Sequence, residues 1–123
     1  MTVSSAYKLF AIDLFAPFGE VSVRALFGGG GIYHQGVMMG LIADEQIYFK
    51  VDEENRPAFE AADLPPFIFE RGDGRQIAMS FYLAPDEIFD DPDALIRWAD
   101  GALAAARRVA ARKKPKRLKK RRG

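Results

Sequence analysis

Short apolar runs separated by turn signals fill residues 20–51, and this rhythm restricts the fold more than any other feature of the chain. The runs are residues 21–25, 32–33, 37–43 and 46–51. Two dipeptides between them, Gln35-Gly36 and Asp44-Glu45, are typical of tight turns. Connections of this length join antiparallel strands, because parallel strands need a long crossover. The stretch therefore predicts an antiparallel meander.

Helical patterns flank these strands. Near the N-terminus, apolar residues recur at every fourth position, at Ala6, Phe10, Leu14 and Phe18. This spacing, with Tyr7 and Phe15 beside it, predicts one apolar face of a helix over about residues 3–15. Ser4 or Ser5 can cap its start. Near the C-terminus, Asp91-Pro92 is a cap residue followed by proline at the first helical position. Apolar residues from Leu95 to Val109 continue that helix.

The remaining elements complete a mixed fold. We expect a short helix over residues 56–62, with Asn55 as a candidate cap, and two strands over residues 67–71 and 76–83. A chain of 123 residues that is 49% apolar is expected to form one domain around one core. The expected fold class is α+β with two layers: an antiparallel sheet of about five to six strands, with N-terminal and C-terminal helices packed on it.

Opposite charges are segregated along the chain, although the net charge is only +1. The first 106 residues hold seven basic and all seventeen acidic residues, a net charge of −10. Residues 107–123 hold the other eleven basic residues, a net charge of +11. We expect residues 1–111 to fold and residues 112–123 to form a basic tail that is disordered in the free protein. Dense like charges repel each other, and the tail has too little apolar surface to offset the entropy of ordering.

The basic tail is the strongest indication of a partner. Its cations can replace the counterions condensed on phosphates, which gives a sequence-independent and salt-sensitive affinity for nucleic acid. They are Arg112, Lys113, Lys114, Lys116, Arg117, Lys119, Lys120, Arg121 and Arg122. The tail has no aromatic side chain for base stacking, so it implies no preference for single strands. A solubility tail, anionic lipid, nuclear import and contact with the acidic body are its alternative interpretations.

No catalytic or metal-binding pattern emerges from the residues. The absence of cysteine excludes disulfides and thiol chemistry. The run Gly28–Gly31 is not followed by the Lys-Ser/Thr pair and helix of a phosphate-binding loop. His34, the only histidine, has no evident nucleophile or carboxylate partner, and the acidic clusters at residues 52–54 and 86–93 lack the spacing of a calcium loop. We expect no catalytic residue, no metal and no cofactor.

A second hypothesis is a small-molecule-binding or enzymatic domain. It would use the glycine turn and an aromatic pocket around Tyr33, Tyr48 and Tyr82. Arg24 and Lys50 are isolated charges in otherwise apolar strands, so each could hold a ligand or partner carboxylate, form a structural ion pair, or face solvent.

We expect no export leader, because no export signal is visible near residue 1, and the sequence has no run of about 18 uncharged apolar residues. We therefore expect a cytoplasmic protein without a membrane partner. The sequence leaves its oligomeric state open.

Several short motifs follow one another in a fixed order between about Tyr7 and Arg108. They include Val23-Arg24-Ala25-Leu26-Phe27-Gly28-Gly29, Gly31-Ile32-Tyr33, Tyr48-Phe49-Lys50-Val51-Asp52, Pro66-Phe67, Met79-Ser80-Phe81-Tyr82 and Leu95-x-x-Trp98-Ala99. In this order they resemble the N-terminal domain of the TfoX/Sxy family of bacterial competence regulators. The matching signature positions, which we interpret as structural first, are Arg24, Phe27, Gly28, Gly29, Tyr33, Lys50, Pro66, Phe67 and Trp98.

The resemblance implies a two-layer α+β fold and a regulatory rather than catalytic role. Members of the family support transcription of DNA-uptake genes alongside the cyclic-AMP receptor protein, which implies the transcription machinery as a protein partner. The resemblance supplies no catalytic residues. Full-length regulators carry a second, helical C-terminal domain where this chain has the basic tail, so the chain looks like a stand-alone version of the N-terminal domain.

Overall fold

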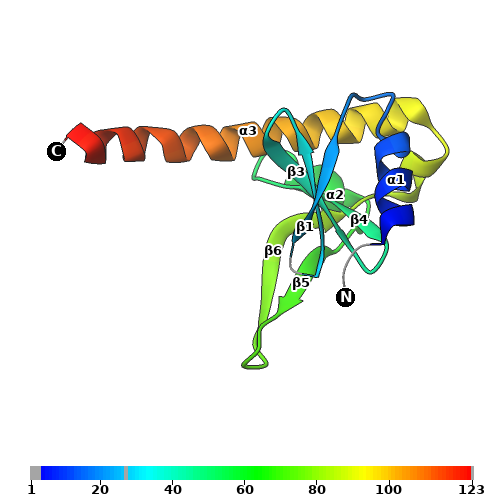
Figure 1. The fold of residues 1–123 in the computed structure, drawn as a ribbon, viewed down its shortest axis with the longest axis horizontal. Helices are drawn as coiled ribbons and strands as arrows, with labels where there is room; N and C mark the ends of the chain where they lie inside the picture. Colours follow the sequence, from blue (N-terminus) through cyan, green and yellow to red (C-terminus); the bar gives the residue numbers. More distant parts are fainter. Residues whose placement is uncertain (1–3, 27, 123) are drawn as a thin grey trace.

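Three α-helices, one 3₁₀ helix and six strands make up the computed structural model, which describes residues 4–26 and 28–122 (Figure 1). For residues 113–122 it describes the path of the helix but not the side chains. The elements in chain order are α1 (Ser5–Leu14), β1 (Ser22–Leu26), β2 (Gly29–His34), β3 (Val37–Ala43), β4 (Gln46–Lys50), α2 (Arg56–Ala61), β5 (Pro66–Glu70), β6 (Gln76–Leu83), η1 (Asp86–Phe89) and α3 (Pro92–Arg122).

The six strands form one antiparallel sheet in the order β1-β2-β3-β4-β6-β5. The first four strands are the predicted meander. Both predicted turns are confirmed: Gln35 and Gly36 have φ of 51° and 80°, and Asp44 and Glu45 have φ of 52° and 57°. Two consecutive left-handed residues are what a two-residue hairpin needs to match the twist of its strands. The expected α+β class, with helices from both ends of the chain, is also confirmed.

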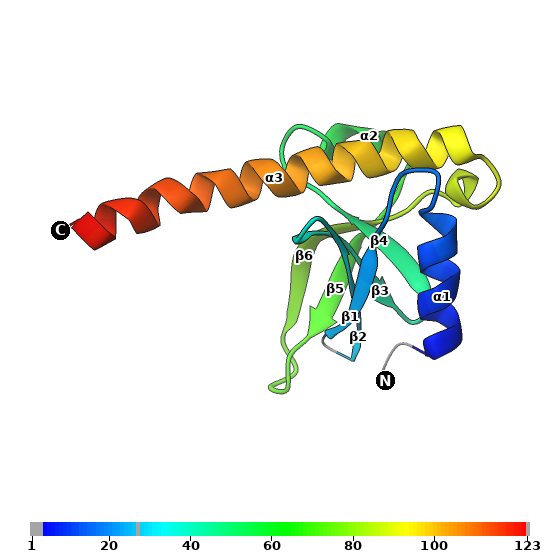
Figure 2. The same ribbon diagram turned by 45° about the horizontal axis from the view of Figure 1, so that its top comes forward.

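The hydrophobic core lies between the helices and one face of the sheet (Figure 2). Phe15 from α1, Phe59 from α2 and Leu95 from α3 all belong to it, together with Ile32 and Phe49 from the sheet. Asp91 begins α3 as predicted, because its Oδ1 accepts hydrogen bonds from the backbone N–H groups of the first turn. The predicted apolar stripe of α3 is buried as far as Ala106.

The buried face of α1 differs from the prediction. Phe10 is 44% exposed, whereas Ala11 and Phe15 are fully buried. The helix therefore turns the row Tyr7–Ala11–Phe15 toward the sheet. Leu14 and Phe18 of the predicted row also pack against the core, whereas Phe10 does not. Both rows have a four-residue repeat, so periodicity alone does not distinguish them. Ser4 is confirmed as the cap, because its hydroxyl accepts a hydrogen bond from the Tyr7 N–H.

The glycine run belongs mainly to a strand and not to a turn. β2 begins at Gly29, and a Cβ added there would collide with the carbonyl oxygen of Ile42 on β3. This is the close backbone approach that glycine permits. Gly28, with φ of 79°, supplies the left-handed residue before the strand. Phe27 lies outside the described residues.

Helix α3 runs without interruption from Pro92 to Arg122, so it has no end at residue 111. Figures 1 and 2 both show its C-terminal part projecting beyond the sheet. The sequence boundary at residue 111 therefore marks a change in charge and burial and not the end of a helix. Disorder of residues 112–123 in the free protein stays a prediction, and so does the role of their side chains.

Candidate functional site

One face of the sheet is turned away from the helices, and we call it the open face. Cα partners across the strands share a face, as do residues two apart on one strand. Its central residues are Arg24, Gly31, Tyr33, Leu41, Tyr48, Lys50 and Phe81. Leu41 and Phe81 are buried, but they do not belong to the hydrophobic core that lies between the sheet and the helices.

Two of the predicted signature residues carry the positive charge of this face. The guanidinium of Arg24 lies over the ring of Tyr33, 4.8 Å from its centroid. The ammonium of Lys50 lies over the ring of Phe81 at the same distance and donates a 2.7 Å hydrogen bond to Ser80. Each cation is thus held against the sheet by an aromatic ring. The structure assigns both residues to the outward side of their strands.

Gly31 allows the Tyr33 ring to lie close to the sheet. A Cβ added at Gly31 would come within 2.9 Å of Tyr33 Cε1. The ring therefore occupies the space that a side chain would fill, with Arg24 above it. Tyr48 contacts Phe67 of β5 edge to face at 5.2 Å between ring centroids. Burial, and secondarily the Asp44 carboxylate, raises the pKa of the Tyr48 hydroxyl.

A buried ion pair fixes α3 to the loop that follows β4. Arg108 donates two hydrogen bonds to the Asp52 carboxylate, from Nε at 2.6 Å and from a terminal nitrogen at 2.8 Å. The backbone N–H groups of Glu54 and Asn55 donate to the same carboxylate. Asp52 is only 6% exposed. The Arg108 hydrogen bonds, helped by these N–H groups, hold the pKa of Asp52 well below its ordinary value although burial opposes this shift.

Asn55 extends this connection. Its side-chain oxygen accepts from the Asp52 N–H at 2.8 Å, and its amide nitrogen donates to the carbonyls of Lys50 and Gly101. The side chain was expected to cap α2 and makes no such cap. Instead, it joins the end of β4 to the middle of α3.

A groove of about 480 Å³ lies beside this ion pair, where α3 passes the end of β4. Lys50 and Ser80 line it from the sheet, and Val109 and Arg112 line it from α3. Arg112 is the first cation of the predicted tail. The groove therefore connects the base of the tail with the positive end of the open face.

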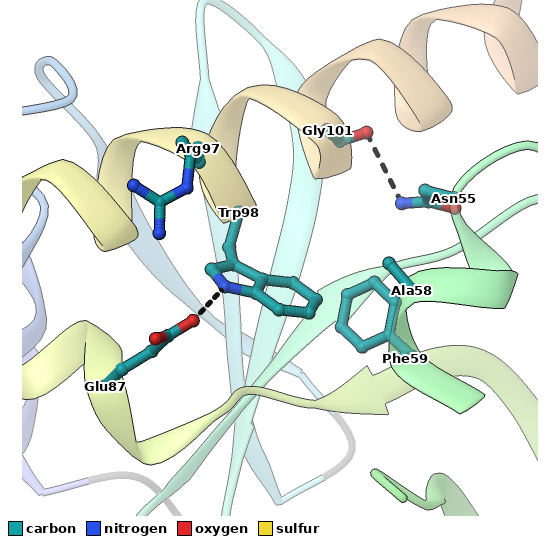
Figure 3. A pocket seen from close by; sticks show the side chains of 7 residues that line it. All are labelled: Asn55, Ala58, Phe59, Glu87, Arg97, Trp98 and Gly101. Carbon is teal, nitrogen blue, oxygen red and sulfur yellow. Dashed lines mark hydrogen bonds between the residues drawn. The ribbon is translucent and has the colours of Figure 1, made fainter. Parts of the chain in front are cut away.

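The only tryptophan, Trp98, lines a second pocket of about 300 Å³ between α2, η1 and α3 (Figure 3). Its indole contacts the buried Phe59 ring edge to face at 4.9 Å. Its Nε1–H donates a 2.7 Å hydrogen bond to Glu87. Figure 3 shows Glu87 and Arg97 on one side of the indole and Phe59 on the other. The pocket thus has an apolar floor and a charged rim.

The other residues considered in the sequence lie away from the cations of the open face. Pro66 and Phe67 lie on the edge strand β5, and a pocket of about 240 Å³ separates Phe67 from Gly28 and Gly29. His34 donates through Nδ1 to the carbonyl of Glu20 at 2.8 Å and so ties the loop before β1 to the end of β2. Tyr82 contacts Phe59 under the helices. The pocket suggested around Tyr33, Tyr48 and Tyr82 is therefore wrong, because Tyr82 lies on the opposite face of the sheet.

Sequence reasoning missed two of these arrangements. Asp52 and Arg108 are 56 positions apart, and neither carries a local signal of its partner. Glu87 was interpreted as part of an acidic cluster near a helix N-terminus, yet it accepts the hydrogen bond of Trp98.

Among the described residues, no three carboxylate or imidazole groups come together as ligands for a metal ion. None of the helices in the described part of the chain combines the length and apolar composition needed to cross a membrane.

Comparison with known proteins identifies the family. No match was found among curated proteins. The family model of the TfoX N-terminal domain matches residues 13–106, which include β1 to β6 and the buried part of α3. This match covers more than half of the 123 residues, so the chain belongs to the TfoX N-terminal domain family.

Proposed function

We propose that this protein is a non-catalytic regulatory module that contacts nucleic acid through the basic end of α3 and a protein of the transcription machinery through its folded body. The family suggests a regulatory, competence-related role and is generally non-enzymatic. The observation that carries the proposal is the position of the positive charge. Helix α3 extends residues 112–122 beyond the sheet (Figure 1). All seventeen acidic residues precede this segment in the sequence.

The structure sharpens the division of charge seen in the sequence. Arg108 is paired with Asp52, and Arg107 donates a hydrogen bond to the side chain of Gln35. These two cations belong to the body. Residues 1–111 therefore hold nine basic and seventeen acidic residues, a net charge of −8, and residues 112–123 carry +9.

Nine cations on one segment make strong, salt-dependent phosphate binding the expected behaviour. If all of them contacted phosphates, the slope of log affinity against log salt would be about −8 for duplex DNA. Cations near the C-terminus of a helix also interact favourably with its dipole. Neutralisation by phosphate removes the repulsion between like charges one turn apart, which favours the helical form of this segment. We expect its helicity to rise when nucleic acid is added.

The test compares duplex DNA binding by the full chain, by residues 1–111, and by the full chain with the nine basic residues of 112–122 changed to glutamine. Fluorescence anisotropy over a series of salt concentrations gives affinity and slope. We expect the full chain alone to bind with a steep salt dependence. The glutamine variant separates charge from length. Equal affinity of the three proteins would overturn the proposed role of the tail.

Binding of a small apolar molecule at the Trp98 pocket is a second candidate function. The observation that favours it is Gly101, which lines the pocket in the middle of α3. A Cβ added there would meet no atom within 4 Å, so packing does not require glycine, although glycine costs a helix about 1 kcal/mol relative to alanine. Quenching or enhancement of Trp98 fluorescence by anilinonaphthalene sulfonate tests the pocket. Gly101→Leu should abolish the response, and an unchanged response would contradict this function.

A further inference from the structure

The strands are nearly free of acidic side chains, although the body is strongly acidic. In the six strands Glu70, at the end of β5, is the only acidic residue. Glu70 and Asp44 line the pocket at the far end of the open face, near Gly28. The opposite end holds Lys50, and Arg24 lies on the edge strand β1. This distribution makes the part of the open face from Arg24 to Lys50 complementary to an anion.

Aromatic rings lie directly beneath these two cations: the Tyr33 ring under the Arg24 guanidinium, and the Phe81 ring under the Lys50 ammonium. Arg24 on β1 and Lys50 on β4 are three strand spacings apart, about 14 Å. Tyr33 lies low over Gly31, and both Tyr33 and Tyr48 are half-buried. A planar guanidinium such as that of Arg24 stacks on nucleobases as an aromatic ring does.

The open face is continuous with the basic end of α3. The groove beside Asp52 brings Lys50 and Arg112 to one surface. Asp52, Glu53 and Arg56 also line that groove. The charge of Asp52 is paired with Arg108, and the charges of Glu53 and Arg56 are opposite, so Lys50 and Arg112 leave the groove net positive. A polyanion bound to the tail can therefore continue onto the open face past Lys50.

We infer that the open face is a stacking platform for unpaired bases, so that the tail and the platform together prefer single-stranded nucleic acid to duplex. This inference rests on the proposed function and names the form of nucleic acid. Bases of a duplex stack on each other and offer no ring face to the surface of the sheet, whereas unpaired bases stack on aromatic and guanidinium groups. The tail contacts phosphates of both single strands and duplexes, whereas the platform adds stacking contacts for single strands only.

The experiment measures anisotropy of a labelled oligothymidylate of about 15 nucleotides and of a duplex of the same length with the full chain. The platform variants are Arg24→Gln and Tyr33→Leu. Arg75→Gln, at the hairpin tip, and Phe89→Leu, on η1, are matched controls because each changes an exposed cation or aromatic ring elsewhere. Circular dichroism melts establish that each variant folds. Arg24 is exposed, so Arg24→Gln should fold and can test the inference even if Tyr33→Leu does not fold.

We expect each platform variant to weaken binding of the single strand about tenfold and binding of the duplex less than about twofold. The controls should change both affinities by less than about twofold. An unchanged ratio of single-strand to duplex affinity in the folded platform variants would overturn the inference and leave the tail's role intact. If removal of residues 112–123 weakens neither form, the proposed function fails, and the ratio still decides whether the platform exists.

Discussion

The carboxylate of Asp52 joins α3 to the loop after β4, and the substitution Asp52→Asn isolates its charge because an amide has nearly the same shape. The asparagine oxygen can still accept from the backbone N–H groups of Glu54 and Asn55. It cannot accept both hydrogen bonds of Arg108, because its second terminal atom is a donor. The variant therefore removes the ion pair while it preserves the turn.

The expected loss follows from the lost charge of the carboxylate and from the Nε hydrogen bond to Oδ2, which an amide nitrogen cannot accept. A hydrogen bond to a charged group contributes about 1.5–3 kcal/mol, and breaking a buried ion pair from one side costs about 3–5 kcal/mol. Arg108 is partly exposed and retains Glu54 at 3.3 Å, which lowers the cost. We expect the free energy of unfolding to fall by about 2–3 kcal/mol at neutral pH.

The pH dependence provides a second, independent signature. The pKa of Asp52 is depressed in the folded protein, so the ion pair stabilises the fold above the unfolded pKa of about 4. This contribution decreases as the pH falls below that value. Asp52→Asn lacks it, so the stability difference between the two proteins should be constant near neutral pH and should shrink below about pH 4.

Urea unfolding followed by Trp98 fluorescence at several pH values measures both effects. Asp13→Asn, at an exposed carboxylate of α1, is the control for the loss of one negative charge. A difference below about 0.5 kcal/mol at neutral pH would refute the stabilising role of the pair. A difference that persists undiminished in acid would refute its assignment to the ionised carboxylate.

Three further outcomes follow from particular contacts. Gly29→Ala should lower the free energy of unfolding by more than about 3 kcal/mol in urea titration, because the added methyl group collides with the Ile42 carbonyl; a loss below about 1 kcal/mol would contradict this. Gly101→Ala should raise it by about 0.5–1 kcal/mol, since the methyl group enters open space on a helix, and a decrease would show that the site is strained. Removal of residues 112–123 should shift the melting temperature by less than about 2 °C, because the buried face of α3 ends at Ala106, and a larger drop would place the segment in the fold.

Local signals in the sequence were enough to predict the turns and the start of the last helix. Gln35-Gly36 and Asp91-Pro92 determine backbone conformation through their own residues, so no distant contact is needed to interpret them. Packing choices were harder. The four-residue repeat that contains Phe10 and the one that contains Ala11 are equally regular, and only contact with the sheet selects the second.

Contacts between residues far apart in the sequence could not be predicted from it. Asp52 belongs to an acidic run that is typical of a solvated loop, and Arg108 belongs to the beginning of a basic run. Their pairing depends on α3 crossing the end of β4. The position of β6 between β4 and β5 is likewise a product of tertiary pairing, because the two strands that follow α2 could have joined the sheet in either order. The sequence alone therefore could not predict that Arg24, Tyr33 and Lys50 share one face of the sheet, because this depends on the strand register.

The Asp52–Arg108 pair also explains why the charge boundary of the chain is not its functional boundary. The basic run begins at Arg107, but its first two members are held by the body. Arg112 lies four residues, about one helical turn, beyond Arg108, and this spacing brings it into the groove beside Lys50. The ion pair thus sets where the tail leaves the body relative to the open face. If tail and platform bind one strand together, Asp52→Asn should reduce the preference for single strands without weakening duplex binding, because the cations of the tail are untouched and one negative charge is removed.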